Sequence, residues 1–304
     1  MIDEIADALR DCRSERDFWR VQLRAESILT PLEIAALIEF SHRLPLRTQE
    51  WLKRIASLGE FGDAEPQRFC RQPLAPNIDV YRDPFVASDH KRLILGFCGG
   101  ADRLMMPIAC VLQYLPSDRC DLVVLRDPTW QHYLKGIPPY AHSLPDLVRR
   151  IAADIGAETY WRIYCYGASM GAFSALRCGI LQKAHGAISL GGRFHWQPLR
   201  PRYKSDRMLP AFDPLCDCNS GTTTELFCVY AAENARDVEN AKHLSRILPV
   251  KHIAISDTSE HNVIVALWTK GELKAFYDRM FALHERGDKP MQRDIATDHQ
   301  CLIA

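Results

Sequence analysis

The sequence predicts an α/β protein in which helices cover both faces of a mostly parallel sheet. Two observations predict this class. From about residue 70 onward, short runs rich in Val, Ile, Leu and Cys alternate with helical stretches, as expected of strands that are buried on both faces. One of these runs leads through a Gly-x-Ser-x-Gly sequence straight into a helix, a junction that places a serine above the sheet.

The composition is that of an ordinary globular protein. Of 304 residues, 47% are hydrophobic and 25% are charged, and 38 Lys and Arg balance 38 Asp and Glu. This balance gives no overall positive field, so we expect no nucleic-acid partner. The charged beginning of the chain and the lack of an apolar run of about 18 residues predict a cytoplasmic protein without a membrane span.

The eleven cysteines are placed like core residues and not like a disulfide framework. Four of them lie inside apolar runs, where a free thiol behaves as a small hydrophobic group. Cys216 and Cys218 form a Cys-x-Cys pair that lacks the second pair of ligands a zinc site needs. We therefore expect neither a metal nor a cofactor. The four cysteines in apolar runs are Cys98, Cys110, Cys165 and Cys228.

Residues 1–68 are expected to form a helical N-terminal appendage. Thr30 followed by Pro31 resembles an N-cap with proline at the first helical position, and the apolar residues that follow recur at helical spacing. Trp51 continues this spacing in the next stretch. No catalytic motif occurs in the segment, so it is expected to pack on the core or to bind a partner protein or a second copy of the chain.

Residues 69–284 carry the alternating strands and helices. The expected strands are Arg92 to Phe97, Asp121 to Leu125, Trp161 to Tyr166, Gly186 to Leu190, Leu226 to Tyr230 and His252 to Ile255. The expected helices are Leu144 to Ile155, Gly171 to Gln182, Val238 to Leu248 and Val263 to Leu283. Residues 285–304 lack periodicity and are expected to form a loose tail.

Ser169 is the predicted nucleophile. It stands in Gly167-Ala168-Ser169-Met170-Gly171, directly after the strand RIYCY and before the helix AFSALRCGIL. A nucleophile elbow needs this context, because a sharp strand-to-helix turn lifts the hydroxyl above the sheet. The two glycines allow neighbouring backbone to approach the turn closely.

The base and the acid are expected after later strands, in the order Ser, acid, His. His261 follows the strand HIAI and precedes a long helix, whereas His252 lies at the start of that strand and so at the wrong edge of the sheet. Asp237 precedes a helix after the strand ELFCVYA and is the favoured acid. Glu233 and Asp257 remain alternatives, because the first is nearer the strand end and the second shares the histidine's loop.

Two backbone N–H groups are expected to stabilise the oxyanion. One belongs to Met170, the residue after the nucleophile. The other belongs to Gly100 or Ala101, in the glycine-containing loop after the strand LILGF, and the sequence does not choose between them.

With these pieces in place, residues from about 90 to 283 resemble the α/β-hydrolase superfamily. The resemblance implies an eight-stranded type of sheet, a Ser-acid-His triad, and hydrolysis or transfer of an acyl group. Cys98 departs from the His-Gly pair that begins the oxyanion loop in many esterases. A narrower similarity, to hydrolase-like proteins of bacterial surface glycan and capsule assembly, rests on Arg126-Asp127, Trp130 and Ser169-Met170-Gly171. It implies a glycan-linked acyl ester as substrate.

Two segments are expected to contact the substrate. Asp127, Trp130 and His132 follow the end of a strand and are expected to line the pocket. Residues 193–221 lie where lids are often inserted in this fold, and their cations and aromatic rings suit sugars, carboxylates or phosphates. The candidates in this possible lid are Trp196, Arg200 and Arg202.

Three functions follow from these features. The first is a serine esterase or deacylase that acts on a small-molecule or glycan acyl ester. The second is an acyltransferase or thioesterase that uses the same triad. The third is a non-catalytic scaffold of this fold that binds a partner through its N-terminal helices. The complete Ser169, Asp237 and His261 set favours the first two over the third.

Overall fold

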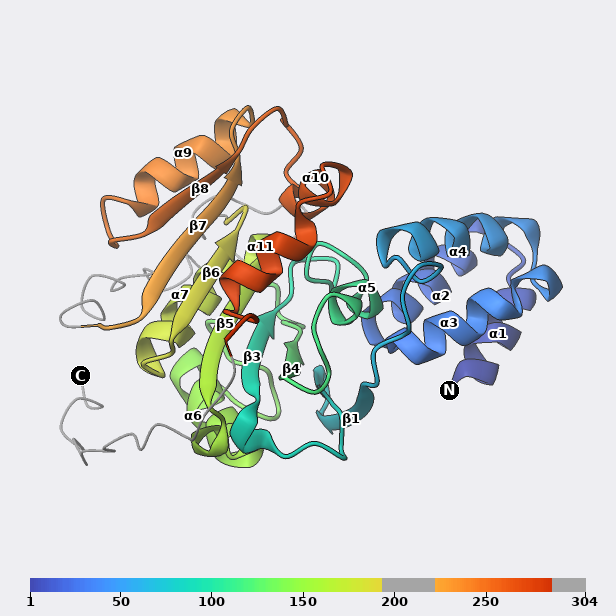
Figure 1. The fold of residues 1–304 in the computed structure, drawn as a ribbon, viewed down its shortest axis with the longest axis horizontal. Helices are drawn as coiled ribbons and strands as arrows, with labels where there is room; N and C mark the ends of the chain where they lie inside the picture. The colour runs from blue at the N-terminus through green and yellow to red at the C-terminus, as the bar shows by residue number, and fades with distance from the viewer. Residues whose placement is uncertain (193–221, 286–304) are drawn as a thin grey trace.

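The computed structural model describes residues 1–192 and 222–285 (Figure 1). The possible lid, 193–221, lies outside these residues, and so do its candidates Trp196, Arg200 and Arg202. The expected tail, 285–304, is described only at Glu285.

Four helices form the N-terminal part of the chain: α1 (Ile2–Arg10), α2 (Glu15–Ile28), α3 (Pro31–Glu39) and α4 (Leu46–Leu58). The start of α3 is fixed by a capping box, in which Thr30 accepts from the backbone N–H of Glu33 and the Glu33 side chain accepts from the backbone N–H of Thr30. Pro31 opens the helix, as the sequence predicts, because the N–H that it lacks would have had no partner inside the helix.

Eight strands form one sheet in the order β1-β2-β4-β3-β5-β6-β7-β8. Strands β4, β3, β5, β6, β7 and β8 are parallel, and β2 is antiparallel to β1 and β4. The strands are β1 (Cys70–Ala75), β2 (Ile78–Arg82), β3 (Arg92–Phe97), β4 (Cys120–Leu125), β5 (Arg162–Ala168), β6 (Gly186–Leu190), β7 (Glu225–Ala231) and β8 (Lys251–Ile255). All six expected strands are present within two residues of their expected ends.

Helices cover both faces of the sheet, because its central strands are apolar on both sides. On one face the core includes α6 (Leu144–Ile155), α7 (Ala172–Leu181) and α9 (Ala235–Leu244). On the other face it includes α5 (Ile108–Gln113), α10 (Val263–Thr269) and α11 (Leu273–Met280). The stretch expected to be one helix from Val263 to Leu283 is therefore two, with Gly271 between them in the left-handed conformation.

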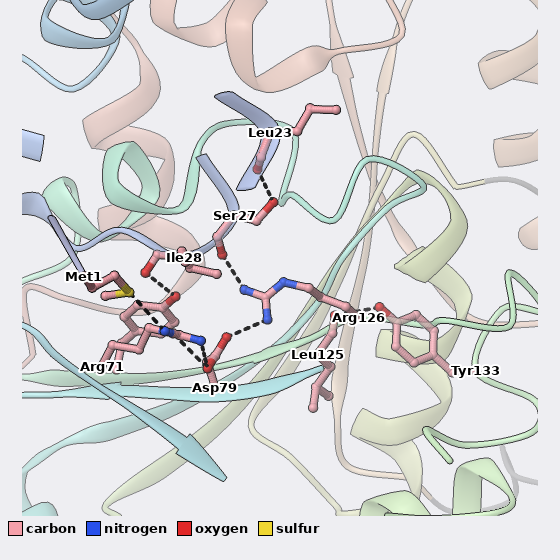
Figure 2. A network of polar contacts seen from close by, with 10 residues as sticks. Met1, Leu23, Ser27, Ile28, Arg71, Asp79, Leu125, Arg126 and Tyr133 are labelled. Atoms are coloured by element: carbon pink, nitrogen blue, oxygen red, sulfur yellow. Dashed lines mark hydrogen bonds and ion pairs between the residues drawn. The ribbon is translucent and has the colours of Figure 1, made fainter. Parts of the chain in front are cut away.

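The N-terminal helices share a hydrophobic core with the sheet face covered by α5, and in Figure 1 they lie beside that helix. Two polar contacts reinforce this packing, one partly buried and one buried. Glu26 of α2 forms an ion pair with Arg103, in the loop after β3. Arg126, at the end of β4, donates to the Ser27 carbonyl of α2 and to Asp79 of β2 (Figure 2). Both loops that follow β3 and β4 are therefore attached to α2.

Candidate active site

Ser169 lies in the sharp turn between β5 and α7, with a left-handed φ of 49°. Such a φ is strained for serine and is typical of a nucleophile elbow. Both flanking glycines are sterically required. A Cβ on Gly167 would lie 2.4 Å from the carbonyl oxygen of Gly171, and a Cβ on Gly171 would lie 2.4 Å from the carbonyl oxygen of Phe97. The turn therefore packs directly on the carboxyl end of β3.

His261 lies in the loop between β8 and α10, and its Nε2 is 3.0 Å from Ser169 Oγ. The imidazole is partly exposed, at 28% of its side-chain surface. Gly191, at the end of β6, makes room for the ring: a Cβ there would lie 2.8 Å from His261 Cε1. His252 lies at the opposite edge of the sheet, where its ring contacts the Ser245 hydroxyl.

Asp237 lies in the first turn of α9. Its carboxylate oxygens Oδ1 and Oδ2 lie 3.0 and 3.1 Å from His261 Nδ1. It is buried, with 2% of its surface exposed, so the contact is shielded from water. Asn234 caps α9 by accepting from the Asp237 backbone N–H and ties this turn to the histidine loop by donating to the Ser259 carbonyl.

The other two acid candidates lie elsewhere. Asp257 is exposed and pairs with Lys270, and hydrogen bonds from Ser256 and Lys270 hold the pKa of the Asp257 carboxyl below its usual range. Glu233 is exposed as well, and its backbone N–H bonds to Thr258. The structure thus brings Asp237, and neither alternative, to the imidazole.

The loop after β3 forms a tight turn beside Ser169. The Gly99 N–H donates to the Arg103 carbonyl, and the Asp102 N–H donates to the Gly99 carbonyl. Within the described part of the chain, no hydrogen bond uses the N–H of Gly100 or Ala101. Met170 lies in the short helix Ser169–Gly171, and the first N–H groups of a helix have no acceptor within that helix. None of these three candidate N–H groups is thus taken up by a backbone hydrogen bond among the described residues.

Of the three residues expected to contact substrate after β4, the structure leaves only Trp130 accessible. Asp127 is buried, and its carboxylate accepts from the backbone N–H groups of Thr129, Gln131 and Tyr133. His132 is fully buried, with Nδ1 at 3.0 Å from the Met170 carbonyl oxygen. The expectation that Asp127 and His132 line the pocket is corrected accordingly, because both side chains are directed into their own loop and the elbow.

Several residues that hold the site have no sequence motif of their own. Gly191 is one. Asn262, next to the histidine, donates to the Met105 carbonyl at 2.7 Å and so joins the histidine loop to the loop after β3. The buried carboxylate of Glu26 accepts from Trp51 Nε1 at 2.8 Å as well as from Arg103. The contact with Arg103 fixes the turn after β3 against the N-terminal helices.

No group of three or more His, Cys, Asp and Glu side chains is arranged to hold a metal ion within residues 1–192 and 222–285. Cys216 and Cys218 lie outside that range. Among the helices described, none combines the length and the apolar character needed to cross a membrane.

Comparison with solved structures identifies the fold. No protein-family model matches the sequence, and no curated protein matches it. The 2,6-dihydroxy-pseudo-oxynicotine hydrolase superposes with a TM-score of 0.51 at 13% identity, over 95% of this chain and 89% of that chain. Est1E from Butyrivibrio proteoclasticus superposes with a TM-score of 0.45 at 14% sequence identity, over 70% of this chain and 99% of that chain. An alpha-beta serine hydrolase homologue from Coxiella burnetii superposes with a TM-score of 0.43 at 13% sequence identity, over 73% of this chain and 99% of that chain.

The chain has the α/β-hydrolase fold, as its sequence predicts. The superposition on the 2,6-dihydroxy-pseudo-oxynicotine hydrolase covers 95% of this chain, so it includes N-terminal helices as well as the sheet.

We predict that Cys98, which directly follows β3 and begins the tight turn beside Ser169, is chemically inert in the native protein. Burial raises the pKa of its thiol to about 12, so it stays protonated near neutral pH and reacts poorly. Iodoacetamide at neutral pH should modify the exposed Cys70 and spare Cys98, which peptide mass spectrometry resolves. In denaturant both should react. Inactivation that follows modification of Cys98 would contradict this prediction.

Proposed function

We propose that this protein is a serine hydrolase that cleaves an acyl ester, with Ser169 as nucleophile, His261 as base and Asp237 as the acid that orients the base. One observation carries the proposal: Ser169 Oγ, the imidazole and a buried carboxylate form an unbroken hydrogen-bonded chain, with 3.0 Å at each contact. The location of Ser169 at a strained strand-to-helix turn of an α/β-hydrolase fold supports the same function.

In the proposed mechanism, His261 Nε2 takes the proton of Ser169 as Oγ attacks the ester carbonyl carbon. The negative charge on the carbonyl oxygen faces the N–H of Met170 and that of Gly100 or Ala101. The ester C–O bond then breaks, and His261 returns the proton to the departing alcohol. Water repeats the sequence on the acyl-enzyme, which releases the carboxylic acid and restores Ser169.

The proposed substrate is a polar acyl ester of a small molecule or a glycan. The link to a glycan rests on the short sequence similarity around Arg126-Asp127, Trp130 and Ser169-Met170-Gly171, and stays a prediction. Transfer of the acyl group to another alcohol, or its release from a thioester, would use the same three residues with a different acceptor or leaving group.

The test is labelling with a fluorophosphonate probe, followed by assays on matched esters and thioesters. We expect the probe to modify Ser169, as located by peptide mass spectrometry, and to abolish ester hydrolysis in proportion. Labelling with turnover of thioesters alone, or with acyl transfer to an added alcohol, would select the second function. A chain that neither reacts with the probe nor cleaves any substrate would be the non-catalytic scaffold.

A further inference from the structure

A pocket of about 870 Å³ lies where the N-terminal helices meet the hydrolase sheet. Its walls come from three separate parts of the chain: helix α2, the β1–β2 hairpin and the oxyanion turn at Gly100 to Asp102. Arg126 and Trp130, both after β4, complete the lining. The volume is within the range of small-molecule sites, which is about 300–1,000 Å³.

The strand order places this pocket along the same edge of the sheet as Ser169. Ser169 follows β5, the oxyanion turn follows the adjacent β3, and Arg126 and Trp130 follow β4, one strand further. Ile78, at the start of the antiparallel β2, pairs with Leu125 at this edge. Because neighbouring strands lie about 4.8 Å apart, the pocket begins within about 10 Å of the nucleophile and extends away from it.

The near end of the pocket is the oxyanion turn itself. The ring of Trp130 lies so close over Gly100 that a Cβ there would be 2.8 Å from the ring. A substrate whose carbonyl oxygen faces this turn therefore has Trp130 and the pocket directly beside it. Asp102 is the acidic residue that lines this end of the pocket, and it is exposed.

The far end of the pocket has an excess of positive charge. Three arginines line it, Arg24, Arg71 and Arg126, against one lining aspartate, Asp79, and Arg24 also pairs with the exposed Glu4. Asp79 is shared by two of the arginines, with Arg71 at 2.8 Å from one oxygen and Arg126 at 2.7 Å from the other (Figure 2). Arg126 is buried, and its Nε has no hydrogen-bond partner among the described residues.

Between the two ends the walls are largely apolar, from Leu23 and Ile28 of α2 and Leu74 of the hairpin. A ligand that is an extended chain with an apolar middle and an anionic end would fit these apolar walls and the arginines at the far end. Arginine is well suited to a terminal carboxylate because its planar guanidinium can bind both oxygens.

The catalytic geometry selects the part of the substrate that enters. His261 must give a proton to the departing alcohol, so the alcohol lies on the β8 side of Ser169. With the alcohol at His261 and the carbonyl oxygen at the oxyanion turn, the acyl chain is the remaining substituent that can extend beyond that turn to the pocket. Resting on the proposed function, we infer that this pocket binds the acyl group, and that the preferred acyl group is an extended chain ending in a carboxylate.

Two aryl esters of equal chain length test this inference: the monoester of octanedioic acid and the ester of octanoic acid. They differ only by the terminal carboxylate. We expect kcat/KM to be at least about tenfold higher for the octanedioate ester, since one charge-assisted hydrogen bond is worth about 1.5–3 kcal/mol. The ratio should decrease with added salt, because the pocket is open to solvent.

Variants at the far end should reduce this ratio. Arg71→Met leaves Asp79 paired with Arg126, and Arg24→Met removes only a pair with the exposed Glu4, so both variants should fold. In each we expect the ratio to fall at least threefold. Arg149→Met is the matched control, because Arg149 pairs with Asp146 on the distant helix α6 and should leave the ratio as it is.

Binding to the Ser169→Ala variant tests the pocket independently of turnover. By calorimetry we expect octanedioic acid monoamide to bind at least about tenfold more tightly than octanamide. Equal dissociation constants, or an ester ratio that the two arginine variants leave unchanged, would overturn the inference. If neither ester is cleaved and the fluorophosphonate does not label Ser169, the proposed function fails, and the binding comparison still decides the question of the pocket.

Discussion

Ser169→Ala is expected to lower kcat for ester hydrolysis by at least about 10⁴-fold, with little change in stability. The hydroxyl that forms the acyl-enzyme is removed, and triad members act as a unit worth several orders of magnitude. The backbone at this position already has a φ of 49°, and alanine tolerates it no worse than serine, so the turn should persist. Steady-state kinetics and the thermal midpoint, measured on the same preparation, check both parts of the prediction.

The matched control is Ser88→Ala, which lies just before β3 at the amino edge of the sheet, where Ser88 contacts Thr159. It should keep both its turnover and its labelling by fluorophosphonate. If Ser169→Ala instead retained near wild-type kcat on a substrate that the parent cleaves, Ser169 would not be the nucleophile. A loss of turnover together with a large fall in the thermal midpoint would show that the variant perturbs folding, and its kcat would then be compared at a lower temperature.

The central sheet could be predicted because its strands are buried on both faces and therefore appear as continuous apolar runs. The hairpin formed by β1 and β2 was not predicted, because β1 lacks such an apolar run. Pro73 lies within β1 and Pro76 in the connecting turn, and β1 is an edge strand whose side chains are exposed or half-buried. Edge strands carry polar residues and proline because only one of their sides is paired. The hairpin matters because it supplies one wall of the pocket.

The three proposed catalytic residues could be found from the sequence because each follows a strand, and the carboxyl ends of parallel strands meet at one edge of the sheet. Position after a strand does not give the direction of a side chain. Asp127 and His132 were therefore expected to contact substrate, although both are buried. Nor could local spacing reveal Gly191 or Glu26, because each acts on a residue far away in the chain.

Asp237→Asn is the second change with a large expected effect, a fall in kcat of about 10³–10⁴-fold. The carboxylate accepts a hydrogen bond from His261 Nδ1, which leaves Nε2 free to take the proton of Ser169. An asparagine amide in its place can donate to Nδ1, which stabilises the tautomer with the proton on Nε2. That tautomer cannot act as the base. Folding should be affected little, because the cap of α9 uses the Asn234 side chain and the backbone N–H at position 237, which the variant retains.

Asp257→Asn and Glu233→Gln are the controls, because they change the two other acids that the sequence allowed. Asp257 pairs with Lys270 on the surface, where water screens the two charges, so the pair contributes little to stability. Both controls should therefore keep kcat within about twofold of the parent. A large loss in either, with Asp237→Asn near wild type, would transfer the acid's role to that residue. Small effects in all three would instead mean that His261 needs no buried carboxylate, a result at odds with the burial of Asp237 beside its ring.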